Sequence, residues 1–139
     1  MIQARCAGDL VCRLEEGEDL LPSLLSLEVG AGVIMSGVGM LRDLEFGYWD
    51  GSRYLVERLS EPVELLSLQG NLALFGEERT IHCHAAVARR GGQALGGHVL
   101  RATVHNTTEA VVHLLPGIHL ERREEKTGLR GLYPRTQNT

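Results

Sequence analysis

The sequence lacks the features that mark several special classes of protein. None of its hydrophobic stretches approaches the ~20 residues that a membrane-spanning helix needs. Its N-terminus does not have the basic and then apolar layout of a secretory signal peptide. The three cysteines, Cys6, Cys12 and Cys83, are an odd number and too few for a disulfide scaffold. We therefore expect a protein of the reducing cytoplasm with no membrane partner.

Aromatic residues and lysine are also scarce. The chain has one Trp, three Tyr and two Phe, and Lys126 is its only lysine. The formal net charge is −4, so no overall positive charge attracts the chain to nucleic-acid phosphates. Hydrophobic residues make up 43% and charged residues 23%, which excludes a disordered chain and a coiled coil. The length of 139 residues predicts one domain over 1–139, with a flexible tail at 135–139.

Glycine, in contrast, is abundant, and its 17 residues favour tight turns and therefore strands. One helix is predicted over residues 18–28, where leucines recur at helical spacing. Glu18 and Asp19 fall in its first turn, where carboxylates suit the helix dipole, and Gly30 and Gly32 end it.

The rest of the chain has strand-like patterns. They cover residues 9–14, 33–36, 40–49, 54–59, 63–68, 80–88, 94–100, 101–104, 110–115 and 120–123. A further hairpin is expected through Thr127 and Gly128, and residues 107–112 fit either a second short helix or a strand. Because strands outnumber helices without alternating with them, we predict an α+β fold: a mostly antiparallel sheet with one or two helices.

The most chemically informative residues are three histidines. His82 and His84 are two apart on a predicted strand, so their side chains point to the same face. His98 lies on the next strand and is the natural third ligand for a divalent ion. Zn²⁺ is the expected ion, because three imidazole ligands and a water make a familiar open zinc site. Ordinary half-buried strand histidines would give the same spacing, so this interpretation stays open.

The length of the loop before His98 decides which face this histidine takes. A three-residue loop, Arg90 to Gly92, pairs Arg89 with Gln93 and brings His98 opposite His84, on the same face. A two-residue loop, Gly91-Gly92, places His98 on the other face unless a bulge shifts the register back. The sequence allows both.

The remaining candidates carry weaker signals. Cys83 alternates with the histidines and is expected in the core, whereas His105, His113 and His119 follow no ligand spacing and are expected to be structural. A small-ligand pocket next to the metal is predicted to include three further residues. They are Ser36, Gly37 and Asn71.

No catalytic residue can be assigned from spacing. Arg42, Glu45, Glu57 and Glu64 lie on strand-like segments, and surface ion pairs account for them as well as catalysis does. The short basic points are flanked by acidic residues and are expected to form a solvated surface. They are Arg89-Arg90, Arg122-Arg123, Arg130 and Arg135.

Several segments, in this order and spacing, resemble the plants and prokaryotes conserved domain, abbreviated PPC or PCC. The resemblance covers roughly residues 5–132. The segments are Arg13–Leu20, Ser36–Gly39, Asp43–Trp49, Glu64–Asn71, Ile81–Ala85 and Gly96–His98.

The resemblance implies a small α+β domain that assembles as a homotrimer. In plants this domain follows AT-hook motifs in nuclear DNA-binding proteins and mediates association between proteins. In bacteria and archaea it stands alone and is often described as DNA-binding. Stand-alone members are similar in fold to acetolactate decarboxylases, whose metal is held by a His-x-His and a third histidine. That role would fall on His82, His84 and His98 here.

This sequence departs from the plant proteins in having no AT-hook, since no Arg-Gly-Arg-Pro core occurs. Direct sequence-specific DNA binding is therefore not expected. We predict a stand-alone homotrimeric domain with a metal site of unassigned activity, whose role is DNA-associated or regulatory and is exerted through partner proteins. The alternative is a small metal-dependent lyase or hydrolase that acts on a small carbonyl or carboxylate substrate.

Overall fold

The structure is a computed structural model, and it describes residues 1–137. These residues form nine strands and one short helix, so the chain is mostly strand. The elements are β1 (Ile2–Cys6), β2 (Asp9–Glu15), α1 (Leu20–Leu25), β3 (Gly32–Trp49), β4 (Tyr54–Leu59), β5 (Val63–Phe75), β6 (Glu78–Ala88), β7 (Ala94–Leu114), β8 (Ile118–Glu124) and β9 (Arg130–Thr136).

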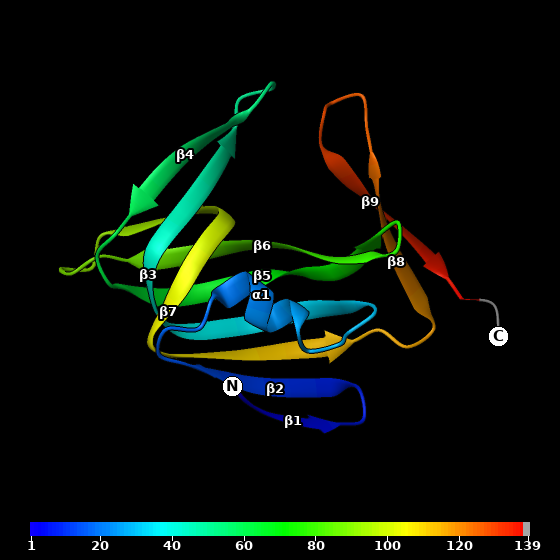
Figure 1. The fold of residues 1–139 in the computed structure, drawn as a ribbon, viewed down its shortest axis with the longest axis horizontal. Helices are drawn as coiled ribbons and strands as arrows, with labels where there is room; N and C mark the ends of the chain where they lie inside the picture. Colours follow the sequence, from blue (N-terminus) through cyan, green and yellow to red (C-terminus); the bar gives the residue numbers. More distant parts are fainter. Residues whose placement is uncertain (138–139) are drawn as a thin grey trace.

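All nine strands belong to one mixed sheet (Figure 1). Its main order is β1-β2-β7-β3-β5-β8-β9, with β4 paired to β3 and β6 paired to both β5 and β7. Every pairing is antiparallel except the single parallel contact between β5 and β8 at Leu74 and Glu121. The long strands β3 and β7 carry register shifts along their shared ladder, which let them bend and meet several partners.

The helix is shorter than the predicted span of 18–28. It begins at Leu20 and ends at Leu25, and no acidic residue lies in its first turn. The reason is that residues 18 and 19 pair with β7 instead: the Glu18 carbonyl accepts the Val104 N–H at 2.9 Å, and Asp19 forms a bridge with Thr103. At the other end, Glu28 has a positive φ of 55°, which a continuing helix does not allow.

Most predicted strands are present, but several are parts of longer ones. The expected segments 33–36 and 40–49 are both within β3, and residues 94–115 are almost entirely within β7. Residues 107–112 are therefore strand and not helix. Bulges, not loops, separate the segments, because a bulge keeps the chain in the ladder. The strand β1 was not predicted.

The C-terminal hairpin is where the sequence indicated it. Gly128 and Glu125 close the turn, with the Gly128 N–H donating to the Glu125 carbonyl at 2.9 Å. The flexible tail was expected from residue 135, but Arg135 and Thr136 belong to β9 and pair with β8. Residues 138–139, also part of that expectation, lie outside the described residues.

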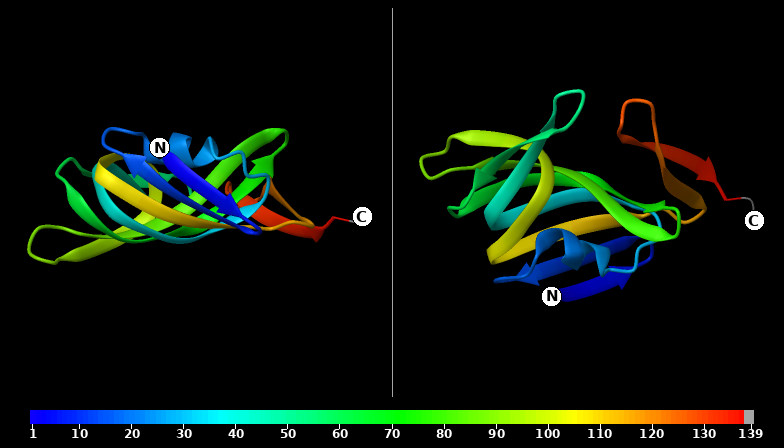
Figure 2. Two further views of the ribbon diagram at one scale, coloured as in Figure 1. Left: turned by 90° about the horizontal axis from the view of Figure 1, so that it is seen from below. Right: turned by 45° about the horizontal axis from the view of Figure 1, so that its top comes forward.

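The core lies on the face of the sheet that α1 covers (Figure 2). Leu20 and Leu24 of α1 are fully buried there, together with alternate residues of the strands such as Leu10 and Leu14 of β2 and Leu68 of β5. The intervening residues point to the opposite face. Within residues 1–137, no helix is long and apolar enough to cross a membrane.

Candidate metal centre

The register of β6 and β7 decides where His98 lies. His84 stands directly opposite His98, and the ladder continues to Ala88 opposite Ala94. The Arg89 N–H donates to the Gln93 carbonyl at 2.9 Å and closes a three-residue loop. The two-residue loop is thus excluded, and His98 takes the same face as His84.

The three histidine side chains converge on one point. One ligand nitrogen from each of His82, His84 and His98 lies within 4.8 Å of the other two. The ring centroids are 5.0 Å apart for His82 and His84, 4.8 Å for His82 and His98, and 5.4 Å for His84 and His98. A single cation could contact all three rings after small side-chain rotations.

The electrostatics of the cluster favour neutral imidazoles at His82 and His98. Burial lowers the pKa of His82 to about 4, and the Arg122 cation and the two other histidines add to the shift. Burial also lowers the pKa of His98, with contributions from His84 and Arg122. Neutral imidazole is the form that binds metal. In addition, the His98 Nδ1 atom is buried and has no hydrogen-bond partner among the described residues, so it is free to bind a cation.

Strand alternation keeps the neighbouring cysteine away from this cluster. Cys83 is buried in the core on the other face, as predicted, and burial raises the pKa of its thiol to about 12. Gly70 of β5 stands opposite Cys83. A Cβ at Gly70 would come within 2.7 Å of the Cys83 Cα atom. The close approach of β5 and β6 at the histidines therefore requires glycine at this position.

Aromatic rings form a wall beside His98. Tyr54 of β4 stacks on the His98 ring at 5.1 Å with an interplanar angle of 9°, and Trp49 meets Tyr54 edge-on at 5.2 Å. Gly47 of β3 stands opposite His98, and a Cβ there would lie 2.7 Å from the Tyr54 Cδ1 atom. The missing side chain at Gly47 leaves room for the Tyr54 ring.

A cavity of about 480 Å³ opens next to two of the histidines. Its lining comes from the first residue of β4, from β6 and β7, and from the β8–β9 hairpin. The β3–β4 and β8–β9 hairpins extend in the same direction in Figure 1. The cavity lining includes His82, His98 and Tyr54, with Arg122 and Arg130 from the C-terminal hairpin. The volume is in the range of small-molecule sites.

Of the three residues predicted to line a ligand pocket, one lies near this cavity. Asn71 stands opposite His82 in the β5–β6 ladder, and its Oδ1 atom accepts a hydrogen bond from Arg122 at 2.7 Å. Ser36 is exposed, and Gly37 packs against Leu68. None of the three, Asn71 included, is among the described residues that line the cavity.

The charged residues considered for catalysis are positioned elsewhere. Arg42 forms ion pairs with Glu16 at 3.0 Å and with Asp43 at 2.9 Å. Glu45 pairs with Arg58 at 3.1 Å. Two others take no part in the cavity lining that the structure describes: Glu57, opposite Phe46, and Glu64, opposite Ala88.

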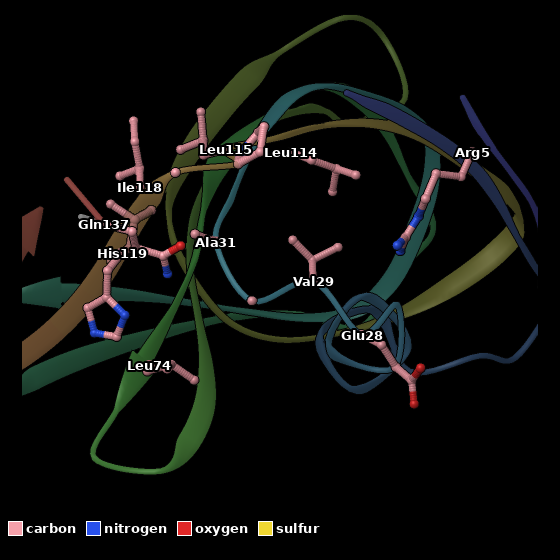
Figure 3. Close-up of a pocket in the computed structure, with 14 residues that line it drawn as sticks. Arg5, Glu28, Val29, Ala31, Leu74, Leu114, Leu115, Ile118, His119 and Gln137 are labelled. Carbon is pink, nitrogen blue, oxygen red and sulfur yellow. The ribbon is translucent and has the colours of Figure 1, made fainter. Parts of the chain in front are cut away.

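The three other histidines do not join the cluster. The His113 Nδ1 atom lies 2.8 Å from Asp9, and the His105 Nδ1 atom lies 3.6 Å from Glu16. His119 lines a separate cavity of about 310 Å³ (Figure 3). There His119 stands on the opposite side from Arg5, whose guanidinium donates to the Leu27 carbonyl at 3.0 Å. That cavity brings together no set of convergent ligand atoms among the described residues.

Sequence reasoning missed Arg122 and Tyr54 as members of the site. Arg122 was taken for part of a solvated basic surface, whereas its guanidinium is partly buried at the cavity. No local signal distinguishes it from Arg123, because the docking of the β8–β9 hairpin beside the histidines is a long-range contact.

Comparison with known proteins places this fold and its histidines in one family. The family model for the Plants and Prokaryotes Conserved (PCC) domain matches residues 1–116. The chain belongs to the PCC domain family. The match includes His82, His84 and His98 but ends before the β8–β9 hairpin. A comparison with curated proteins finds no match.

Solved structures with this fold match almost the whole length of this PCC-domain protein. A plant- and prokaryote-conserved protein from Pyrococcus horikoshii is 27% identical, with a TM-score of 0.81, over 93% of this chain and 91% of that one. A metal-containing protein from Archaeoglobus fulgidus is 28% identical, with a TM-score of 0.83, over 96% of this chain and 99% of that one. A candidate DNA-binding protein from Bacteroides thetaiotaomicron is 21% identical, with a TM-score of 0.88, over 95% and 96%. This last likeness shows the fold alone.

Proposed function

We propose that this PCC-domain protein binds one divalent cation, zinc, in each subunit through His82, His84 and His98. The observation that carries the proposal is the convergence of three ligand nitrogens within 4.8 Å on one face of the β6–β7 hairpin. The low pKa of His82 and the unpaired Nδ1 atom of His98 fit a cluster that is completed by a cation and not by protons.

The donor set favours a transition metal over Mg²⁺ or Ca²⁺. Imidazole nitrogen suits zinc and its neighbours, whereas the hard cations prefer oxygen ligands. The cluster contains three imidazoles and no carboxylate among the described residues. An ion held by three protein ligands would polarise a water or ligand oxygen at its remaining position. The similar metal-containing protein from Archaeoglobus fulgidus supports the presence of a metal, without identifying it.

We also propose that the protein is a homotrimer. The support is an apolar patch on the face turned away from the core, formed by Val11, Met35, Val38 and Leu66. These four side chains are between 45% and 57% exposed in the single chain, which is unusual for a cluster of large apolar residues. Contact between subunits would cover them.

The role in the cell is proposed to be association with partner proteins, in the reducing cytoplasm, without direct sequence-specific binding to DNA. Two of the arginines that could contact phosphates are paired with acidic residues: Arg89 with Glu61 at 2.9 Å, and Arg123 with Glu121 at 2.8 Å. No reaction is assigned. We also propose the fold similarity to acetolactate decarboxylases. Arg42, which was considered for catalysis, is held in ion pairs and is not among the described residues that line the cavity next to the histidines.

Metal analysis of protein purified without an affinity tag tests the proposed function. We expect close to one zinc per subunit, retained through gel filtration and lost on treatment with a strong chelator. A parent protein that carries no divalent ion, and takes up none when zinc is supplied, would overturn the proposal.

A further inference from the structure

Arg122 is a cationic side chain beside the histidine cluster that no part of the proposed metal site uses. It belongs to β8, where it pairs with Leu132 of β9. Two contacts fix its guanidinium: Nη2 donates to the Asn71 Oδ1 atom at 2.7 Å, and Nη1 donates to the Arg130 carbonyl at 2.9 Å. Because Asn71 stands opposite His82, these contacts hold the cation next to the metal ligands.

This cation has no paired carboxylate in the part of the chain that the structure describes. The Nε atom of Arg122 is buried and has no hydrogen-bond partner, and no carboxylate forms an ion pair with Arg122 among residues 1–137. Burial lowers the pKa of Arg122, and the main neighbour that favours its charge is Tyr54. Glu125 brings one carboxylate to the same cavity, but it forms no ion pair with Arg122 among the described residues, and its Oε1 atom accepts a hydrogen bond from the Tyr133 hydroxyl at 3.1 Å. A partly desolvated cation without an anion is costly.

The other cation of the cavity is also occupied. Arg130 lies over the Phe75 ring, with its Cζ atom 3.8 Å from the ring centroid. A divalent ion at the three histidines would add two further positive charges, because imidazole binds a metal in its neutral form. The cavity of about 480 Å³ would then be lined by two cationic groups, the bound ion and the Arg122 guanidinium, which together call for a small anion.

We infer that this cavity binds a small carboxylic acid that carries a second oxygen next to its carboxylate, as 2-hydroxy and 2-oxo acids do. The carboxylate accepts hydrogen bonds from Arg122, and the second oxygen faces the metal. This inference rests on the proposed metal site. A single guanidinium fork matches one planar carboxylate, whereas phosphate groups are typically bound by several donors or by a helix N-terminus, and the described lining contains no helix.

Part of the ligand site lies outside the residues that the family model matches. Arg122, Gly128 and Arg130 all come from the β8–β9 region, which follows the matched residues 1–116. The histidines thus belong to the PCC domain, while the segment after it supplies the group that selects the anion.

Isothermal titration of the zinc-loaded protein with glycolate tests this inference, with ethylene glycol as a probe of similar size and no charge. We expect glycolate to bind and ethylene glycol not to bind. Arg122→Ala should weaken glycolate binding about 10- to 100-fold while zinc content stays at the parent level. Arg122→Lys keeps the charge but not the planar fork, so its affinity for glycolate should lie between those of the parent and Arg122→Ala.

The matched control is Arg123→Ala, one residue along the same strand, because Arg123 is exposed and paired with Glu121. It should bind glycolate like the parent. Thermal unfolding of each variant shows that the fold is kept. Glycolate affinity that is unchanged in Arg122→Ala, or the absence of glycolate binding to zinc-loaded parent, overturns the carboxylate site while leaving the metal site standing. Tighter binding of inorganic phosphate than of glycolate overturns the ligand class. A parent that takes up no zinc overturns the metal site itself, and the inference with it.

Discussion

At the scale of single residues, Gly70 controls how closely β5 and β6 approach behind the histidines. A Cβ at this position would lie 2.7 Å from the Cys83 Cα atom, and backbone atoms cannot move away as a flexible side chain can. We expect Gly70→Ala to lower the free energy of unfolding by about 1–3 kcal/mol, because one added methyl group forces the two strands apart. The same variant should bind zinc more weakly than the parent, because His82 precedes the displaced residue.

Gly30→Ala is the control for this prediction. Nothing lies within 4 Å of a Cβ at Gly30, so the added methyl group should change neither stability nor zinc affinity. Chemical denaturation and competitive zinc titration measure the two quantities. Parent-like values for Gly70→Ala would show that the strands have room which the structure does not indicate.

The sequence allowed the metal-ligand candidates to be predicted but not their surroundings. Strand alternation correctly separated Cys83 from His82 and His84. The position of His98 follows from the three-residue loop, which was one of the two loops that the sequence allowed. Arg122 could not be found in this way. Its place depends on a single parallel contact between β5 and β8 and on the Asn71 hydrogen bond, and neither leaves a pattern in the local sequence.

At the scale of elements, the β8–β9 hairpin is joined to the rest of the sheet more weakly than any long strand. Within residues 1–137, Leu74 and Glu121 are the one pair that joins it to β5, whereas β3 and β7 share a ladder that extends from residue 32 to residue 47 of β3. Most residues of β9 are exposed. We therefore expect the hairpin to open with a smaller free energy than global unfolding.

Native-state hydrogen exchange followed by mass spectrometry measures this difference. Amides of β8 and β9 should exchange faster than those of β3 and β7 in the zinc-loaded protein. Equal protection in both regions would mean that the hairpin is held by more than the contacts seen here.

The boundaries of a strand could be predicted where turns mark its ends, and not where bulges lie within it. The strand from 54 to 59 matches its predicted bounds, because turns delimit it clearly. The bounds of β3 and β7 were wrong, because bulges interrupt the alternation without ending the strand. The helix was predicted too long, because the leucine spacing continues into residues whose backbone pairs with β7 or turns at Glu28.

At the scale of the whole molecule, the apolar patch predicts that subunits associate. Val38 of β3 stands opposite Glu109 of β7. Val38→Lys should convert the expected trimer to a monomer, because it buries a charge between subunits while Glu109 offers it a partner in the free chain. Multi-angle light scattering measures the mass. Leu55→Lys, on β4 and outside the patch, is the control and should remain trimeric. A monomeric parent at micromolar concentration would contradict the trimer.

The charge distribution of the molecule predicts weak binding to DNA. The net charge is −4, and exposed arginines such as Arg89 and Arg135 are paired with carboxylates. We expect no preference between DNA sequences at physiological salt, measured by fluorescence anisotropy with labelled duplexes. Sequence-selective binding with a clear dependence on salt would contradict this expectation.

The central claim is that three histidines from two paired strands hold one metal ion. The most direct test is the zinc content per subunit of the untagged parent and of four variants, His82→Ala, His84→Ala, His98→Ala and His105→Ala. The parent and His105→Ala should carry close to one zinc, because His105 lies outside the cluster. The other three variants should carry almost none, since two imidazoles hold a divalent ion far more weakly than three. An unchanged zinc content in His98→Ala would contradict the three-histidine site.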